Sequence, residues 1–139
     1  MESGAILDEQ IIASSEYDGN HAAKQGRLNF LAVPGKAGSW SARTNDANQW
    51  IQVKLPSNTK ISRFLTQGRN AFNQWVTKYQ LMYSEDGLNF HYYHERGQSS
   101  PKVQIFDKEI EFRQHKREIL LENICYVKQV ICQIGRAHV

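Results

Sequence analysis

The sequence predicts a mostly β fold for its first 98 residues, and three observations predict it. Apolar and polar residues alternate through residues 51–55, and in the run 78–83 Tyr79, Leu81 and Tyr83 alternate with Lys78, Gln80 and Met82. The second run is followed by Asp86-Gly87, a dipeptide typical of tight hairpin turns. Glycine and proline break up the rest of this part of the chain. A period of two is that of a half-buried strand, so we expect an all-β domain built from short strands.

The expected elements follow in order along the chain. Residues Gln10–Ser15 form a short β-prone run, and Glu16–Gly38 read as a long loop with several glycines. The strand at 51–55 is ended by Pro56, and residues 60–69 ("KISRFLTQGR") predict the next strand. After the turn at Asp86-Gly87, the returning strand is expected to continue the alternation with Leu88, Phe90 and Tyr92.

The pattern changes after Gln98. From Lys116 onward, apolar residues recur at spacings of three and four: Leu120, Ile124, Val127, Ile131 and Ile134. This spacing predicts a helical tail. On such a helix Cys125 and Cys132 lie about 10 Å apart along the axis, too far for a disulfide with each other.

Composition excludes several classes of function. The 139 residues favour one domain, and 17 Lys and Arg against 14 Asp and Glu give a net charge of only +3, which argues against nucleic acid as a partner. No apolar run approaches the ~18 residues of a membrane span, and no signal peptide follows Met1. His91 and His94 point to opposite faces of a strand, so no metal site is expected. No catalytic motif is visible, so neither an enzyme nor a cofactor is expected.

Six motifs carry a family resemblance: "MESGAILDEQIIASS", "RLN", "SWSARTNDANQWIQVKL", "TQGR", "WVTKYQLMYSEDGLNF" and "Y-H-E-R-G", in this order. Together they resemble the discoidin domain, also called the coagulation factor 5/8 type C domain, over about residues 1–98. The resemblance implies a galactose-binding-like jelly-roll β-sandwich without catalysis. It also implies an extracellular or cell-surface module of a larger protein. Such modules bind cell-surface carbohydrate, anionic phospholipid, collagen or protein receptors through loops at one end.

The sequence also departs from this family pattern. The paired cysteines that bound the family domain are absent, and Met1 falls where the family has an internal Met. The family's last strands are not recognisable after Gln98. We therefore expect residues 1–98 to be a partial domain and 99–139 to be a non-family tail, read-through or a gene-model artefact. Residues 134–139 resemble one reading frame of a sequencing adapter. A non-functional fragment with an open sheet edge is the alternative from a different class.

The resemblance places recognition in three loops, at residues 17–26, 30–38 and 68–74. Their candidate ligand-binding residues are Tyr17, His21, Lys24, Phe30, Leu31, Lys36, Arg69, Asn70 and Phe72. An aromatic ring beside Asn, His and Arg suits a sugar, whereas an apolar tip beside Lys or Arg suits a membrane surface. Because the first loop lacks a Trp or Leu at its tip, carbohydrate or glycoprotein is the favoured ligand and anionic phospholipid the alternative.

Several of these residues also have a purely structural interpretation. For Phe30, Leu31 and Val33 the equal alternative is packing under their loop, and for Arg69 it is capping a carboxylate of the fold. Arg27 and Asn29 are expected to be structural, with Asp46 as a candidate partner for Arg27. For the stretch between Trp40 and Trp50, we expect two core aromatics at the ends of two strands, joined by a polar strand and turn.

Overall fold

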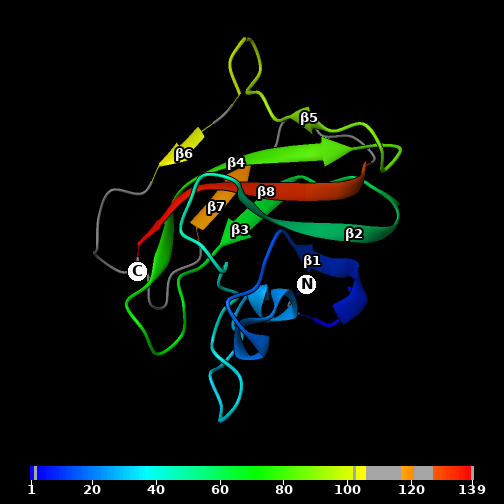
Figure 1. The fold of residues 1–139 in the computed structure, drawn as a ribbon. Helices are drawn as coiled ribbons and strands as arrows, with labels where there is room; N and C mark the ends of the chain where they lie inside the picture. Colours follow the sequence, from blue (N-terminus) through cyan, green and yellow to red (C-terminus); the bar gives the residue numbers. More distant parts are fainter. Residues whose placement is uncertain (2, 102, 106–116, 121–126, 139) are drawn as a thin grey trace.

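The computed structural model describes residues 1, 3–101, 103–105, 117–120 and 127–138, the last three ranges through their backbone pairing (Figure 1). In its larger sheet the strands lie in the order β1 (Ile11–Ala13), β2 (Gln49–Thr59), β8 (Val127–His138), β4 (Trp75–Ser84) and β5 (His91–Tyr92), with β6 (Val103–Ile105) also on β4. The smaller sheet pairs β3 (Arg63–Thr66) with β7 (Arg117–Leu120). Three short 3-10 segments precede β2: η1 (Asp8–Gln10), η2 (Gly19–His21) and η3 (Ala23–Gly26).

The predicted strands are confirmed where the apolar period was clear. The run at Gln10–Ser15 contains β1, residues 60–69 contain β3, and 79–83 lie within β4. Residues 51–55 lie within β2, but this strand runs on to Thr59, so the predicted end at Pro56 is wrong. All strand pairs are antiparallel. Strands therefore form where the alternating apolar residues can be buried on one face.

The core lies between the two sheets. Tyr79, Leu81 and Tyr93 form one buried cluster, and Ile51 and Leu55 of β2 pack against it. Phe64 of β3 reaches Tyr79 of β4 from the other sheet, with 5.9 Å between ring centroids. A second buried cluster forms around Ile6, Ile11 and Ala23 under β1 and β2. The fold is thus a mostly β sandwich.

The β4–β5 hairpin is confirmed, but the returning strand is out of phase by one residue. Tyr92 pairs with Met82, and the Tyr93 N–H donates to the Leu81 carbonyl at 2.8 Å. Tyr93 therefore shares the core face with Leu81, while Leu88 is 83% exposed. Six residues separate β4 from β5, because the Asp86 carboxylate accepts the N–H groups of Leu88 and Asn89 and winds the chain further. A register shift of one residue exchanges the two faces of a strand.

The predicted helical tail is wrong where the structure describes it. Residues Val127–His138 form β8, antiparallel to β2 on one side and to β4 on the other, and Arg117–Leu120 form β7. A central strand satisfies its backbone groups on both sides, and β-branched residues such as Val127, Val130 and Ile131 favour extended structure. Periodicity alone does not separate such an apolar run from a helix. Cys132 lies in β8 and Cys125 lies outside the described residues, so the predicted separation of the two cysteines stays a prediction, without the helix on which it was based.

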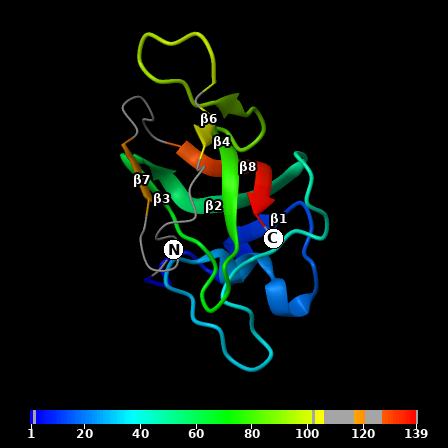
Figure 2. The ribbon, with the colours of Figure 1, turned by 90° about the vertical axis from the view of Figure 1, so that its left-hand side faces the viewer.

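The strand directions bring several connections to one end of the sandwich. Because β8 is antiparallel to both β2 and β4, the latter two begin at the same end, and β1 finishes there. We call residues 14–48 and 67–74 at this end the loop end. Two views at right angles show the 3-10 segments, the cyan loop that follows them and the green loop before β4 on the side of the sheet away from β5 (Figures 1 and 2). In the part of the chain that the structure describes, no helix has the length and apolar character needed to cross a membrane.

Candidate functional site

The three recognition loops expected from the sequence are joined by backbone hydrogen bonds. The Ala37 N–H donates to the Asn20 carbonyl at 2.7 Å, which ties the second loop to the first. The Asn70 N–H donates to the Gly38 carbonyl at 3.3 Å, and the Asn70 side-chain oxygen accepts the Ala32 N–H at 3.0 Å. Asn70 therefore holds both arms of the second loop against the third, so one of the nine candidate residues has a structural task.

Gly38 makes this junction possible. A Cβ at this position would lie 2.6 Å from the Asn70 Cβ and 2.8 Å from the Asn70 carbonyl oxygen. Such distances are well inside van der Waals contact, so only glycine allows the two chains to approach this closely. The relative placement of the second and third loops therefore depends on the close contact between Gly38 and Asn70.

The third loop holds an exposed aromatic ring on a stacked cation. Phe72 is 53% exposed, and the Arg69 guanidinium carbon lies 4.3 Å from its ring centre. Arg69 Nη1 donates to the Gln74 side-chain oxygen at 2.6 Å, and the Arg69 N–H donates to the Gln74 carbonyl at 2.9 Å. Ala71 takes a left-handed conformation, with φ 68°, at the top of this turn. The loop is closed at its base and presents Phe72 outward.

The second loop is a small hairpin with an apolar tip. Val33 and Lys36 exchange backbone hydrogen bonds of 3.0 and 2.9 Å around Pro34-Gly35, and Gly35 has φ 78°, as a Pro-Gly turn requires. Leu31 is 66% exposed and Val33 is 52% exposed, so neither packs under the loop, whereas Phe30 is half-buried. Ligand contact by these residues stays a prediction.

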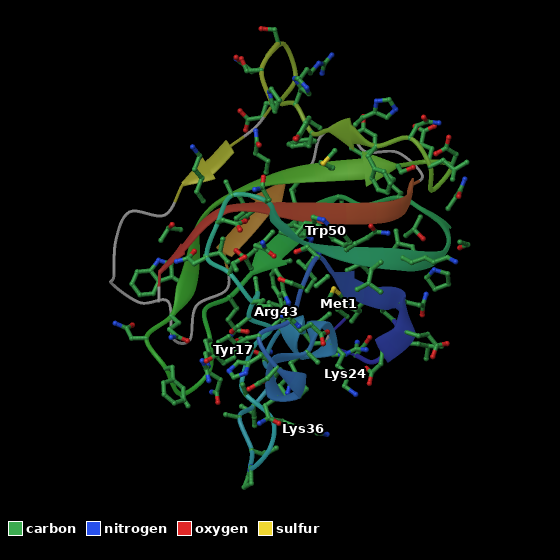
Figure 3. The ribbon with its side chains drawn as sticks, viewed as in Figure 1. Met1, Tyr17, Lys24, Lys36, Arg43 and Trp50 are labelled. Atoms are coloured by element: carbon green, nitrogen blue, oxygen red, sulfur yellow. The ribbon has the colours of Figure 1, made fainter. Side chains whose placement is uncertain are left out.

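The first loop contributes one exposed aromatic residue. The Tyr17 ring is exposed and meets the His21 ring edge-on, with 5.4 Å between centroids. His21 Nδ1 lies 2.6 Å from Asp18 Oδ1, and this hydrogen bond, aided by the Asn20 N–H, holds the pKa of Asp18 below its usual range. Lys24 lies on another side of the 3-10 segments, 3.7 Å from the Asp8 carboxylate (Figure 3). The structure thus brings Tyr17 to the loop end but turns Lys24 toward the N-terminal segment.

Arg27 has a structural environment, but its predicted partner is wrong. Its guanidinium donates to the Asp8 carboxylate and to the Met1 carbonyl, both at 2.7 Å. Asp46 instead accepts from the Gln49 side chain, the Asn48 N–H and the Thr44 hydroxyl, which lower its pKa. Asn29 has φ 57°, and its N–H donates to the Gln67 side-chain oxygen at 2.8 Å. The sequence predicts that a half-buried arginine pairs with a carboxylate or a carbonyl, but it does not predict which carboxylate this is.

A buried glutamine that the sequence analysis missed organises the polar run between the tryptophans. The Gln49 side-chain oxygen accepts from the hydroxyls of Ser14 and Ser15, and its nitrogen donates to Thr44 and Asp46. Residues 41–48 are therefore a loop folded over Gln49, where a strand and turn were predicted. A buried amide with all four hydrogen bonds made is a rigid support. The many Ser, Thr, Asn and Asp residues before β2 are the feature of the sequence that could have indicated such a hydrogen-bonded loop.

The two tryptophans have different surroundings. Trp40 packs against the core cluster around Ile11 and its indole N–H donates to the Ser15 carbonyl at 2.9 Å, so its prediction as a core aromatic is confirmed. It lies in a loop, however, and not at a strand end. Trp50 is the second residue of β2 and is half-buried. Because strand residues alternate, it lies on the face opposite the core-packed Ile51.

The loop end presents apolar and aromatic side chains together with the cations Lys36 and Arg69. Within the described ranges, no three His, Cys, Asp or Glu side chains gather closely enough to hold a metal ion. What the loop end offers is exposed aromatic and aliphatic surface, namely Tyr17, Leu31, Val33 and Phe72, beside Lys36 and Arg69. Apolar groups flanked by a few polar ones suit recognition of a ligand.

Known proteins are similar to this chain in sequence and in fold. The F5/8 type C domain family matches residues 10–118. Lactadherin of Rattus norvegicus is 32% identical over 124 residues, covering 86% of this chain and 28% of that protein; hemocytin of Bombyx mori is 40% identical over 85 residues, covering 61% and 3%. The chain thus spans under a third of these relatives' length. The division of the chain at residue 98 stays a prediction.

Solved structures agree. Wild-type discoidin II from Dictyostelium discoideum superimposes with a TM-score of 0.77 at 25% identity, covering 92% of this chain and 49% of that one. The module CpGH89CBM32-5 from Clostridium perfringens, solved in complex with GalNAc-β-1,3-galactose, has a TM-score of 0.67 at 18% identity, covering 97% and 87%. At that identity the second comparison shows the fold alone. The chain belongs to the F5/8 type C, or discoidin, domain family.

Proposed function

We propose that this chain is an extracellular recognition module that binds cell-surface or matrix carbohydrate, free or on a glycoprotein, through its loop end. The observation that carries the proposal is the Phe72 ring, 53% exposed and stacked on the Arg69 guanidinium at 4.3 Å. No catalytic step is part of the proposal. The chain would act by holding a larger protein against a sugar-bearing surface.

An exposed aromatic ring that is already fixed suits a sugar ligand. The apolar face of a pyranose can stack on the ring, while neighbouring donors and acceptors bind its hydroxyls. Phe72 has few rotatable bonds, and its loop is closed at Arg69 and Gln74, so little conformational entropy is lost on binding. Tyr17 of the first loop offers a second exposed ring at the same end of the sandwich. A sugar-bound protein with the same fold shows only that this fold can host such a ligand.

A glycan array tests the proposal. The unaltered chain, Phe72→Ala and Leu88→Ala would be compared at equal concentration. Leu88 is the matched control because it is also an exposed apolar residue, but lies in the hairpin between β4 and β5 at the opposite end of the sheet. We expect Phe72→Ala to lose most of the signal and Leu88→Ala to retain it. Equal loss in both variants, or no glycan bound by the unaltered chain, would remove the proposal.

A second candidate is an anionic phospholipid surface, favoured by the exposed tip of the second loop. The exposed Leu31 and Val33 precede the Pro34-Gly35 turn, and the exposed Lys36 follows it. An apolar tip can enter the acyl boundary at about 0.8 kcal/mol per buried CH₂, and a lysine near anionic headgroups adds about 1 kcal/mol. Sedimentation with phosphatidylserine and phosphatidylcholine vesicles separates the candidates. Binding only to phosphatidylserine, abolished by the double change Leu31→Ser and Val33→Ser, would favour the lipid.

A further inference from the structure

Arg69 holds a positive charge at the loop end without a counterion in the described part of the chain. The Arg69 Nη1 donates to the neutral side-chain amide of Gln74, and the guanidinium lies over the Phe72 ring. Its Nε is shielded from solvent and has no hydrogen-bond partner. Among the described residues no carboxylate lies within 4.0 Å of the guanidinium, because the three ion pairs found there involve His21, Lys24 and Arg27.

The carboxylates of the loop end are engaged by other groups. Glu16 accepts the Ala23 N–H at 2.6 Å, Asp18 is bonded to His21 and the Asn20 N–H, and Asp46 to three donors around Gln49. Each carboxylate therefore has a local role and none faces Arg69 as a salt-bridge partner. Two further cations of this end, Lys36 and Arg43, are exposed and form no ion pair with the described carboxylates.

This arrangement favours a ligand that brings its own negative charge. Arginine pairs with carboxylate and sulfate through parallel hydrogen bonds that a neutral hydroxyl group cannot match. A cation held beside an aromatic ring can bind a charged sugar at two points. The ring stacks on the apolar face of the sugar, and the guanidinium pairs with its anionic group. Resting on the carbohydrate-binding function proposed above, we propose that the ligand is an acidic glycan, with a carboxylate or sulfate bound at Arg69.

The structural alternative is that Arg69 serves only to close its loop. The backbone bond from the Arg69 N–H to the Gln74 carbonyl contributes to this closure without the side chain. A closing role would also be served by a neutral donor, whereas charge recognition would not. The two roles therefore separate when charge is removed while hydrogen-bonding capacity is kept.

The experiment compares neutral glycans with their sialylated and sulfated counterparts, using the full chain and the variants Arg69→Gln, Arg69→Lys and Arg96→Gln. Arg96 lies in the segment after β5 and serves as the matched loss of one charge. We expect at least tenfold stronger binding of the acidic members, weakened by raising NaCl from 50 to 500 mM. We expect Arg69→Gln to erase this preference, Arg69→Lys to keep part of it, and Arg96→Gln to leave it unchanged. A thermal melt of each variant shows that the fold persists.

The contrary outcomes are distinguishable. Equal binding of neutral and acidic glycans would overturn this inference while the carbohydrate function stands. Equal loss of preference in Arg69→Gln and Arg96→Gln would overturn it too, because the effect would then follow net charge and not the site. Absence of all glycan binding, with retention on phosphatidylserine vesicles, would overturn the inference together with the carbohydrate function and identify a lipid headgroup as the anion.

Discussion

The guanidinium carbon of Arg69 lies 4.3 Å from the centre of the Phe72 ring, three residues along the same loop. This relationship gives an exposed aromatic side chain a fixed position. Exposed cation–π contacts contribute about 0.5–1 kcal/mol, a preference of roughly two- to fivefold for this orientation of the ring. The loop therefore favours an outward-facing position of Phe72 in the absence of a ligand.

Gln74→Ala should loosen this arrangement. The change removes the acceptor of the 2.6 Å hydrogen bond from Arg69 Nη1. One hydrogen bond contributes roughly 1 kcal/mol, so we expect about fivefold weaker glycan binding and faster backbone motion in residues 68–74. NMR relaxation and binding isotherms measure the two effects. The control is Gln98→Ala, at an exposed position outside the loop end, which should alter neither. Unchanged relaxation in Gln74→Ala would refute the closing role.

Gly38→Ala should destabilise the junction of the second and third loops. The added Cβ would lie 2.6 Å from the Asn70 Cβ and 2.8 Å from its carbonyl oxygen, so backbone must shift. Overpacking of this kind costs about 1–3 kcal/mol of unfolding free energy. Gly19→Ala is the matched control, because a Cβ there meets nothing within 4 Å. Urea unfolding should separate the two variants; equal stability would mean that the loops do not meet as described.

Asp86→Asn should change the acid limb of the stability curve. The N–H groups of Asn89 and Leu88 bond to the Asp86 carboxylate and hold its pKa below the usual value near 3.9. A pKa lowered by folding gives stability that is present above about pH 4 and lost as the pH falls toward the folded-state value. We expect urea melts between pH 2 and 6 to show a shallower loss in Asp86→Asn. Glu85→Gln, a change at an exposed neighbour, should keep the original dependence of stability on pH. The same dependence in both variants would contradict a stabilising role for the hydrogen bonds to the Asp86 carboxylate.

Deletion of residues 127–139 tests whether the C-terminal segment belongs to the fold. Strand β8 pairs with β2 and with β4, so its removal would leave two facing strand edges without partners. We expect the shortened chain to lose its cooperative thermal transition, which the full chain should show by circular dichroism. A sharp melt in the shortened chain would instead support a self-sufficient unit ending before this strand.

The sequence predicted most strands because their apolar period has one simple cause, burial of alternate residues between two sheets. Ile51 and Leu81 could be placed on the core face from this alone. Tyr93 could not, because hydrogen bonds to Asp86 lengthen the turn and invert the phase of the returning strand. Nor could β8, since the same apolar spacing fits a helix and only the paired neighbours select a strand.

The candidate site was predictable in kind but not in detail. The position of Phe72 between two asparagines indicated an exposed ring, and the structure exposes it. The task of Asn70 in joining two loops depends on a contact between segments distant in the sequence, and the stacking of Arg69 on Phe72 depends on how their own loop folds. Lys24 illustrates the limit, because its ion-pair partner Asp8 lies in a 3-10 segment outside the recognition loops.

The most direct test of the account is an NMR titration of the isotope-labelled full chain with the glycan that binds best on the array. The account predicts that amide signals shift in residues 17–26, 30–38 and 68–74, with the largest changes around Phe72. Signals of the hairpin at residues 84–92 should stay in place, because it lies at the other end of the sheet. Shifts confined to that hairpin or to the outer face of the sheet, with the loop-end signals unmoved, would contradict the account.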